Sequence, residues 1–327
     1  MKQYVVLIIA VFSVFFMACG SVETVSSVFD GFPHGKREIN KGTVMYKKGC
    51  YRQSLRHFYR AHEIFSASDD LEGVALSLNS IGNIYMTAGN AAKAEMYYEE
   101  ALQIYTRINN RNGIMQALSN LSAAMIDTER FESAGKTLDR LEDMVKQKDD
   151  LYVSYLRNKG IYFLKQKAYI KAEKALNFAL DVISNNDLTE TASVNFAMGN
   201  LMMKTERIEE AIDFFMAALF ADKKTGFSTG IACDLEALGR AYFLIEKNDE
   251  SVDFFKRSIK IYAMTGNREK VETIAEQLAI ASKRSGIDTG VTVQFVKKWA
   301  EGDVLTSFYN ITADFEILTQ VWKGECH

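Results

Sequence analysis

The sequence predicts an all-α solenoid of about six antiparallel helix pairs that ends in a capping helix. A small residue returns at intervals of 38 to 40 residues, at Gly42, Gly82, Ser122, Gly160, Gly199 and Gly239. The same neighbours return with it each time. The chain also has only 1 proline, Pro33, which precedes the repeats, and proline disrupts helix interiors. One supersecondary unit in each period of this size is typical of a solenoid.

Residues 1–18 predict a lipoprotein signal peptide. Lys2 is followed by an apolar run, Val5 to Ala18, of about fourteen residues, which is too short to span a membrane comfortably. The tetrad Phe16-Met17-Ala18-Cys19 resembles the bacterial lipoprotein box, and this resemblance implies cleavage before Cys19 and lipidation of that cysteine. Phe16 stands where leucine is usual, so an uncleaved anchor or a plain secretory signal remains an alternative.

The residue after the cysteine bears on the destination of the protein. Gly20 stands there, whereas aspartate at this place retains Gram-negative lipoproteins at the inner membrane. By resemblance to that sorting rule, we expect a lipid-anchored protein of the bacterial cell envelope, at the outer membrane and facing the periplasm. Residues 19–35 are polar and small enough to form a tether from the bilayer to the first repeat.

Residues 36–286 hold the repeats, and each repeat predicts a helical hairpin. A bulky residue stands three places after the small residue, a small one twelve after and a bulky one sixteen after, as in Tyr85, Ala94 and Tyr98 of the second repeat. Bulky residues at helical spacing form an apolar stripe, and a small residue lets a second helix approach closely. Turn and cap residues recur between the units, among them Asp69-Asp70 and Asn109-Asn110,.

This register resembles the tetratricopeptide repeat. The second repeat carries it most completely, through Gly82, Tyr85, Gly89, Ala94, Tyr98 and Ala101. The resemblance covers residues 36–286 and implies a right-handed α-α superhelix. The usual period of the family is about 34 residues, so the longer period resembles its long-helix subgroup. Armadillo or HEAT repeats, which also have longer periods, are the alternative, but they lack this register.

The end of the array predicts a cap and a separate terminal segment. Residues 268–284 suit a polar-faced capping helix, and Gly286 and Gly290 are expected to interrupt the chain before a partner helix forms,. Residues 287–327 have no repeat register. They contain one amphipathic stripe, formed by Val304, Phe308, Ile311, Phe315, Leu318 and Trp322, which is expected to cover the solenoid end or its groove.

Charge and motif content exclude several function classes. The 39 Lys and Arg nearly balance the 42 Asp and Glu, which leaves no basic footprint for nucleic acid. His57 and His62 are five places apart, so they do not share a helix face for a metal,. No phosphate-binding glycine loop or nucleophile elbow is present in the sequence,. We therefore expect no enzyme, no cofactor, no metal and no small-molecule substrate.

The cysteines predict no internal bridge between repeats. Cys50 falls in the turn of the first repeat, and Cys233 falls on the first helix of the sixth. A disulfide between them would require the array to close on itself, so none is predicted.

The resemblance also implies where a partner binds, because in this family the first helix of each unit lines the concave surface. Four places after the small residue the side chains are apolar, and they include Met86, Ile126, Leu164 and Met203. Asparagines stand one place after it or two before it, at Asn83, Asn120, Asn158 and Asn200. Asparagine donates and accepts hydrogen bonds and so suits an extended peptide backbone. Packing between repeats is the alternative role for both sets.

These expectations combine into one functional hypothesis. A lipid anchor joined to a solenoid without catalytic motifs indicates a non-catalytic scaffold that binds a protein or peptide in its concave groove and is held at the membrane through Cys19. The alternative is an accessory or regulatory subunit of an envelope system that assembles pili, exports polysaccharide or remodels the cell wall.

Overall fold

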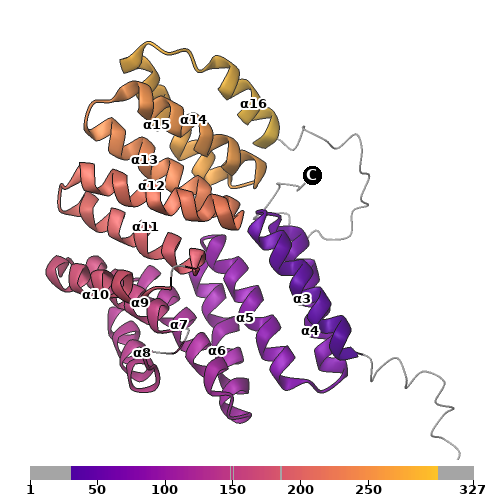
Figure 1. The fold of residues 1–327 in the computed structure, drawn as a ribbon. Coiled ribbons are helices and arrows are strands. Elements are labelled where there is room, and N and C mark those ends of the chain that lie inside the picture. The colour runs from indigo at the N-terminus through magenta and orange to yellow at the C-terminus, as the bar shows by residue number, and fades with distance from the viewer. Residues whose placement is uncertain (1–30, 148, 150, 185, 301–327) are drawn as a thin grey trace, which may run out of the picture.

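The computed structural model of the chain describes residues 31–300, except 148, 150 and 185. This part consists of fourteen α-helices and contains no strand (Figure 1). The first twelve helices form six antiparallel pairs, which confirms the all-α superhelix. The pairs are α3 (Gly31–Lys47) with α4 (Tyr51–Ala67), α5 (Leu71–Thr87) with α6 (Ala91–Arg107), α7 (Arg111–Asp127) with α8 (Phe131–Met144), α9 (Tyr152–Lys165) with α10 (Tyr169–Val182), α11 (Leu188–Lys204) with α12 (Ile208–Thr225), and α13 (Ser228–Leu244) with α14 (Asn248–Met264).

The recurring small residue marks the point where the two helices of a repeat cross. A Cβ atom placed on Gly199 would lie 2.5 Å from the ring of Phe215, sixteen places later. The same pairing joins Gly42 to Phe58, Gly82 to Tyr98, Gly160 to Leu176 and Gly239 to Phe255. The missing side chain therefore makes room for a bulky one in every glycine-bearing repeat, because protein interiors have no spare volume for both.

The turn inside each repeat uses one left-handed residue, seven places after the small one. Gly49 and Gly89 adopt φ values of 77° and 75° there, and Glu129, Lys167, Glu206 and Glu246 adopt 57° to 62° at the equivalent places. A left-handed residue ends a helix and reverses the chain. Between repeats, Asp70, Asn110, Asp187 and Asn267 cap the next helix by accepting a backbone hydrogen bond at 2.9 to 3.1 Å,.

The first helix begins earlier than predicted. It starts at Gly31, so α3 takes in the last five residues of the segment 19–35 that we expected to be a tether. Pro33 is tolerated because it lies in the first turn, where no backbone donor is needed. Gly35 is buried against the ring of Phe65, which gives this extra turn a packing partner.

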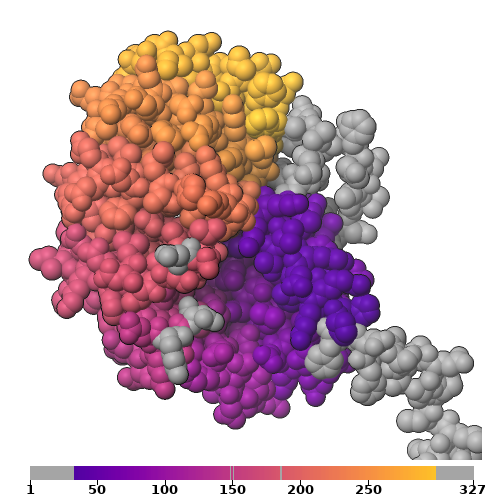
Figure 2. All heavy atoms as spheres, viewed as in Figure 1, coloured from indigo at the N-terminus to yellow at the C-terminus, as the bar shows by residue number. Residues whose placement is uncertain are grey.

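The array curls until its first repeat meets its sixth. This corrects the expectation that the array does not close on itself. The hydroxyl groups of Tyr51 on α4 and Thr229 on α13 form a hydrogen bond, and the rings of Tyr46 and Phe227 lie 5.6 Å apart. The indigo N-terminal pair accordingly lies against the orange C-terminal repeats in Figure 2. Cys233 is nevertheless a free thiol, so it forms no disulfide with Cys50.

The array ends with two helices where one was expected. The capping helix α15 (Arg268–Ser285) ends at Gly286, which adopts a φ of 74°, and α16 (Gly290–Ala300) follows at once. Val296 of α16 is buried in the same core cluster as Ile259 and Leu278. The two glycines therefore separate the helices and do not prevent the second one.

Two further expectations concern parts of the chain beyond this description. Residues 1–30, with the signal and Cys19, and the amphipathic stripe 304–322 lie outside the described residues. Within residues 31–300, no helix combines the length and the apolar character needed to cross a bilayer.

Candidate functional site

The first helices of the last repeats form an apolar hollow, which we name the groove. It has a volume of about 330 Å³ and is lined mainly by α11, α13 and α15. Its first-helix residues stand two places before and one, four and five places after the small residue, as the family resemblance implied. They are Asn200, Met203 and Lys204 on α11 and Ala237, Arg240, Phe243 and Leu244 on α13. Asn200 and Met203, two of the residues predicted to bind a partner, line this hollow.

A second hollow, which we name the chamber, lies where the two ends of the array meet. Its volume is about 550 Å³. The N-terminal side contributes Tyr46 and Lys47 on α3 and Asn83 on α5, and the C-terminal side contributes residues 189–196 of α11 and 229–234 of α13. On α11 and α13 the chamber and the groove therefore lie end to end.

Three of the predicted groove residues bond to their own protein. Asn120 donates a hydrogen bond to Asn79 Oδ1 at 3.0 Å and approaches Asn83 Oδ1 at 3.4 Å. Tyr98 donates to the same Asn83 oxygen at 2.8 Å. Asn200 donates to the carbonyl oxygen of Phe196 at 3.0 Å. Asn83, Asn120 and Asn200 stay partly exposed, so each has both a structural bond and an accessible edge.

Two predicted groove residues are buried, which corrects their assignment. Asn158 is 2% exposed and donates to the backbone oxygen of Ser119 at 2.9 Å and to the hydroxyl of Ser122 at 3.2 Å. Ile126 is also 2% exposed. The amide nitrogen of Asn158 is satisfied by these groups of the preceding repeat, and its oxygen accepts a hydrogen bond from Arg157 of its own helix,. Both residues join repeats together and do not face the open surface.

The two remaining predicted apolar residues contribute to the core. Met86 packs against the cluster that contains Tyr85 and Tyr98, and Leu164 packs against the cluster that contains Leu176 and Leu201. Both are half-buried, and neither lines the groove or the chamber.

The chamber contains two buried carboxyl groups that sequence reasoning missed. Asp222, at the end of α12, is 7% exposed, and Asp234 on α13 is 1% exposed. Burial raises the pKa of Asp222 to about 7. Burial, together with the nearby Asp222, raises the pKa of Asp234 to about 9. Desolvation disfavours the charged form of a carboxyl group, so Asp234 holds its proton at neutral pH.

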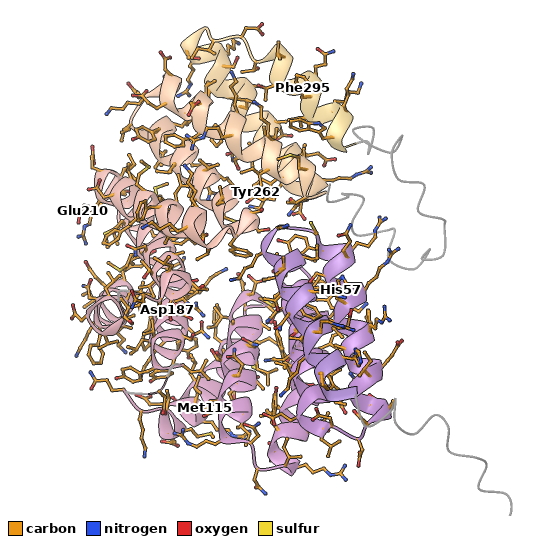
Figure 3. The ribbon with its side chains drawn as sticks, turned by 45° about the vertical axis from the view of Figure 1, so that its right-hand side comes forward. His57, Met115, Asp187, Glu210, Tyr262 and Phe295 are labelled. Carbon is orange, nitrogen blue, oxygen red and sulfur yellow. The ribbon has the colours of Figure 1, made fainter. Side chains whose placement is uncertain are left out.

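Comparison of the six repeats in the sequence distinguishes Asp222 from the residues at the equivalent positions. Twenty-three places after the small residue, the other repeats carry Phe65, Tyr105, Val145, Ile183 and Tyr262, and only the fifth repeat carries an aspartate. Tyr262, labelled in Figure 3, lies within the C-terminal repeats and donates a hydrogen bond to Glu236 at 3.0 Å. A carboxyl group at a position otherwise filled by a large apolar or aromatic side chain indicates a local role other than packing.

The remaining charges around the chamber are largely engaged. Arg157 on α9 pairs with Glu190 of α11 at 2.9 Å. Cys233 is a partly buried thiol whose pKa burial raises to about 11, so it stays protonated and is a poor nucleophile at neutral pH. Among the residues that the structure describes, no three His, Cys, Asp or Glu side chains converge to hold a metal ion.

Comparison with known proteins supports the repeat assignment. Residues 38–107 and 73–147 match the family model for the tetratricopeptide repeat. A TPR repeat-containing protein of Methanocaldococcus jannaschii is 23% identical over 211 residues, which cover 64% of this chain and 34% of that protein. The chain thus spans about a third of the length of that relative.

Two solved structures are similar in fold. A Rap protein complexed with competence and sporulation factor superposes with a TM-score of 0.56 at 15% identity, over 78% of this chain and 76% of that one. A signal transduction ATPase with a tetratricopeptide repeat sensor, from Pyrococcus horikoshii, superposes with a TM-score of 0.56 at 16% identity, over 84% of this chain and 42% of that one. At these identities the likeness concerns the fold alone.

Proposed function

We propose that this chain, whose residues 38–107 and 73–147 match the tetratricopeptide-repeat model, is a non-catalytic scaffold that binds a peptide or protein partner on its concave surface and is held at a membrane by a lipid on Cys19. The observation that carries the binding proposal is the groove, because it collects apolar side chains at the positions that face inward in such repeats. Concave, mostly apolar hollows are the usual form of binding sites.

The exposed apolar side chains of the groove suit a partner segment. Leu244 is 57% exposed and Ile280 is 51% exposed, and Lys204 and Arg240 lie beside them. An apolar floor with a polar rim is the usual anatomy of a protein interface. From residue 189 to residue 204, α11 passes both hollows, a length of about 22 Å at 1.5 Å per residue. An extended peptide of about six or seven residues would match this length.

Similar architectures support the proposal without identifying a partner. The Rap protein structure is a complex with competence and sporulation factor, and the Pyrococcus protein uses its repeats as a sensor. Both are superhelices that reach a TM-score of 0.56 against this chain. Extended concave surfaces are what helical solenoids use for binding, which agrees with the proposal.

Site-specific photocrosslinking in native cells tests the binding proposal. With a benzophenone amino acid in place of Leu244, we expect a discrete crosslinked partner, because this side chain lies in the groove. The matched control places the same group at Ile170, which is 87% exposed on the second helix α10 and outside both hollows. Equal crosslinking at the two positions, or none at Leu244, would contradict a binding site on the concave side.

Fractionation tests the anchor proposal, which rests on the sequence around Cys19 because that residue lies outside the described part of the chain. Cys19→Ala is expected to abolish incorporation of labelled palmitate and to move the protein from the outer-membrane fraction to the soluble periplasm, since a protein without its lipid chains loses their membrane affinity. Cys233→Ala serves as the control and should change neither readout. An unchanged distribution of the Cys19 variant would show that another element anchors the protein.

A further inference from the structure

We propose that the chamber captures a positively charged group of a bound peptide, either its N-terminal ammonium or a lysine or arginine side chain, between Asp222 and Asp234. This inference rests on the proposed function and assigns the chemistry of one end of the binding surface. Four observations on the described residues carry it.

The first observation is that both carboxyl groups replace core residues of the repeat. Asp222 stands where the first, second and sixth repeats carry Phe65, Tyr105 and Tyr262. Asp234 stands five places before the small residue, where the second to fifth repeats carry Ser77, Ala117, Tyr155 and Val194, all buried. Asp222 and Asp234 therefore both differ from the residues that other repeats carry at these positions, and both line the chamber. Packing alone does not require two aspartates there.

The second observation is the space that these departures leave. At the boundary between the first and second repeats, the ring of Phe65 packs against Gly73 of the next helix. At the boundary between the second and third repeats, the ring of Tyr105 packs against Gly113 in the same way. At the boundary between the fifth and sixth repeats the carboxyl group of Asp222 lies closest to Gly230, and the ring of Phe227 lies beside it. An aspartate is much smaller than an aromatic side chain, and Asp222 lines the chamber here together with Phe227 and Gly230.

The third observation is an unsatisfied polar atom. The Oδ2 atom of Asp234 is buried and has no hydrogen-bond partner, and the residue lines the chamber while being only 1% exposed. A buried polar atom without a partner costs about 1 to 3 kcal/mol. A ligand donor placed in the chamber would supply the missing bond.

The fourth observation is the balance of charge around the pair. Arg157 on α9 is already paired with Glu190 on α11, and Lys47 lies on the exposed side of α3. Tyr46 on α3 and Cys233 on α13, the other titratable groups that line the chamber, are neutral at pH 7 because burial raises the pKa of each. Among the described residues, neither Arg157 nor Lys47, the two cations that line the chamber, forms an ion pair with Asp222 or Asp234.

Electrostatics make a cation the favoured occupant. The pKa of Asp234 rises to about 9 and that of Asp222 to about 7, because both carboxyl groups are buried and the charge of Asp222 lies near Asp234. An ammonium or guanidinium group between them would favour ionisation of both and release bound protons. A volume of about 550 Å³ exceeds what a bare metal ion needs, and no metal-ligand cluster occurs among residues 31–300 as described.

The test is peptide selection on the full-length chain, purified in mild detergent. The probe is a position-scanning pentapeptide library in two arms, one with free N-termini and one with acetylated N-termini. The same selection is run on wild type, Asp222→Asn and Asp234→Asn, and circular dichroism verifies that each variant is folded. The control variant is Asp253→Asn, a carboxyl group on α14 that is 65% exposed and pairs with Arg257.

The expected result is that wild type and the control retain basic peptides in preference to others. The best peptide should bind about thirtyfold or more weakly when its charged group is replaced by a neutral one, the loss typical of a buried charge pair. Asp222→Asn and Asp234→Asn should lose this discrimination while still retaining apolar peptides. If both library arms prefer lysine or arginine, the side chain occupies the chamber; if only the free-amine arm is selected, the N-terminus does.

Two outcomes would overturn the inference, and they differ in what else they affect. Retention of peptides without any preference for positive charge, or with the same preference in the two chamber variants, removes the chamber assignment and leaves the proposed function intact. Retention of no peptide by wild type contradicts both the chamber assignment and peptide binding in the groove.

Discussion

Replacing Gly199 by valine is expected to lower the free energy of unfolding by about 3 kcal/mol, the upper part of the usual range for overpacking. A Cβ at this place would lie 2.5 Å from the ring of Phe215, which is 1% exposed and packed in a core cluster. A side chain in a helix interior is favoured over glycine by at most about 1 kcal/mol. The steric clash therefore outweighs the gain in helix propensity, and the variant is expected to be less stable. Urea denaturation followed by circular dichroism measures the change in the free energy of unfolding.

A double-mutant cycle separates the clash from other effects of the substitution. Phe215→Ala alone is expected to cost about 3 to 5 kcal/mol, because it removes a buried ring. Combined with Gly199→Val it should cost clearly less than the sum, since the valine occupies part of the vacated space. Lys204→Val, on the exposed side of the same helix, should change stability by about 0.5 kcal/mol or less. Strict additivity would mean that the two helices do not cross at Gly199.

The helix crossing was predictable because it imposes a local steric rule. A glycine and a bulky residue sixteen places later must fit one contact, so both residue types recur in the sequence, as in Gly82 with Tyr98. The turn residue is different. It adopts a left-handed φ in all six repeats but is glycine only at Gly49 and Gly89. A left-handed residue other than glycine costs about 1 to 2 kcal/mol, and four of the six repeats bear this cost, so glycine is not required at the turn.

Closure of the array could not be predicted from the repeat register. The contact between Tyr51 and Thr229 joins residues 178 places apart. It results from small rotations between neighbouring repeats that accumulate along the array. The total rotation cannot be inferred from the residues of any single repeat. The chamber exists because of this closure, so its lining residues from α3 and α13 could not be grouped together from the sequence.

The predicted binding residues show a second limit of the sequence. An asparagine can bond a partner or the neighbouring repeat, and the residue type does not distinguish the two. Asn158 faces Ser119 and Ser122 and is buried by them, whereas Asn200 bonds only within its own helix and lines the groove. Asp222 in the chamber was recognisable from the sequence, because the other repeats carry a large apolar or aromatic residue at its position. It belongs to no motif of known spacing.

Asp234→Asn is expected to stabilise the protein at neutral pH, by an amount that grows with pH. The pKa of Asp234 rises from 3.8 to about 9 in the folded chain, so the folded state binds the proton more tightly than the unfolded state. Below about pH 4 both states are protonated and the aspartate carries no penalty. Between pH 4 and pH 9 the penalty grows by about 1.4 kcal/mol per pH unit, and above pH 9 it stays constant.

The magnitude makes this effect measurable in a single comparison. At pH 7 the penalty is on the order of 4 kcal/mol, with no discount for solvent because Asp234 is 1% exposed. Urea denaturation of wild type and Asp234→Asn at pH 5, 7 and 9 should give curves that diverge as pH rises. Asp253→Asn, the exposed control, should follow wild type throughout. Parallel curves for wild type and Asp234→Asn would show that Asp234 ionises normally and has water or a counter-ion beside it.

A carboxyl group that costs the folded protein several kcal/mol is difficult to explain by stability alone, since an apolar residue occupies the equivalent place in other repeats, as Val194 does. Functional sites are where proteins keep groups that destabilise them. If the chamber holds a cationic group, that ligand should abolish the divergence between wild type and Asp234→Asn, because the bound charge lowers the pKa of the carboxyl group toward its ordinary value. The pH dependence of stability and the selectivity for positively charged peptides then have one cause, the uncompensated carboxyl pair of Asp222 and Asp234.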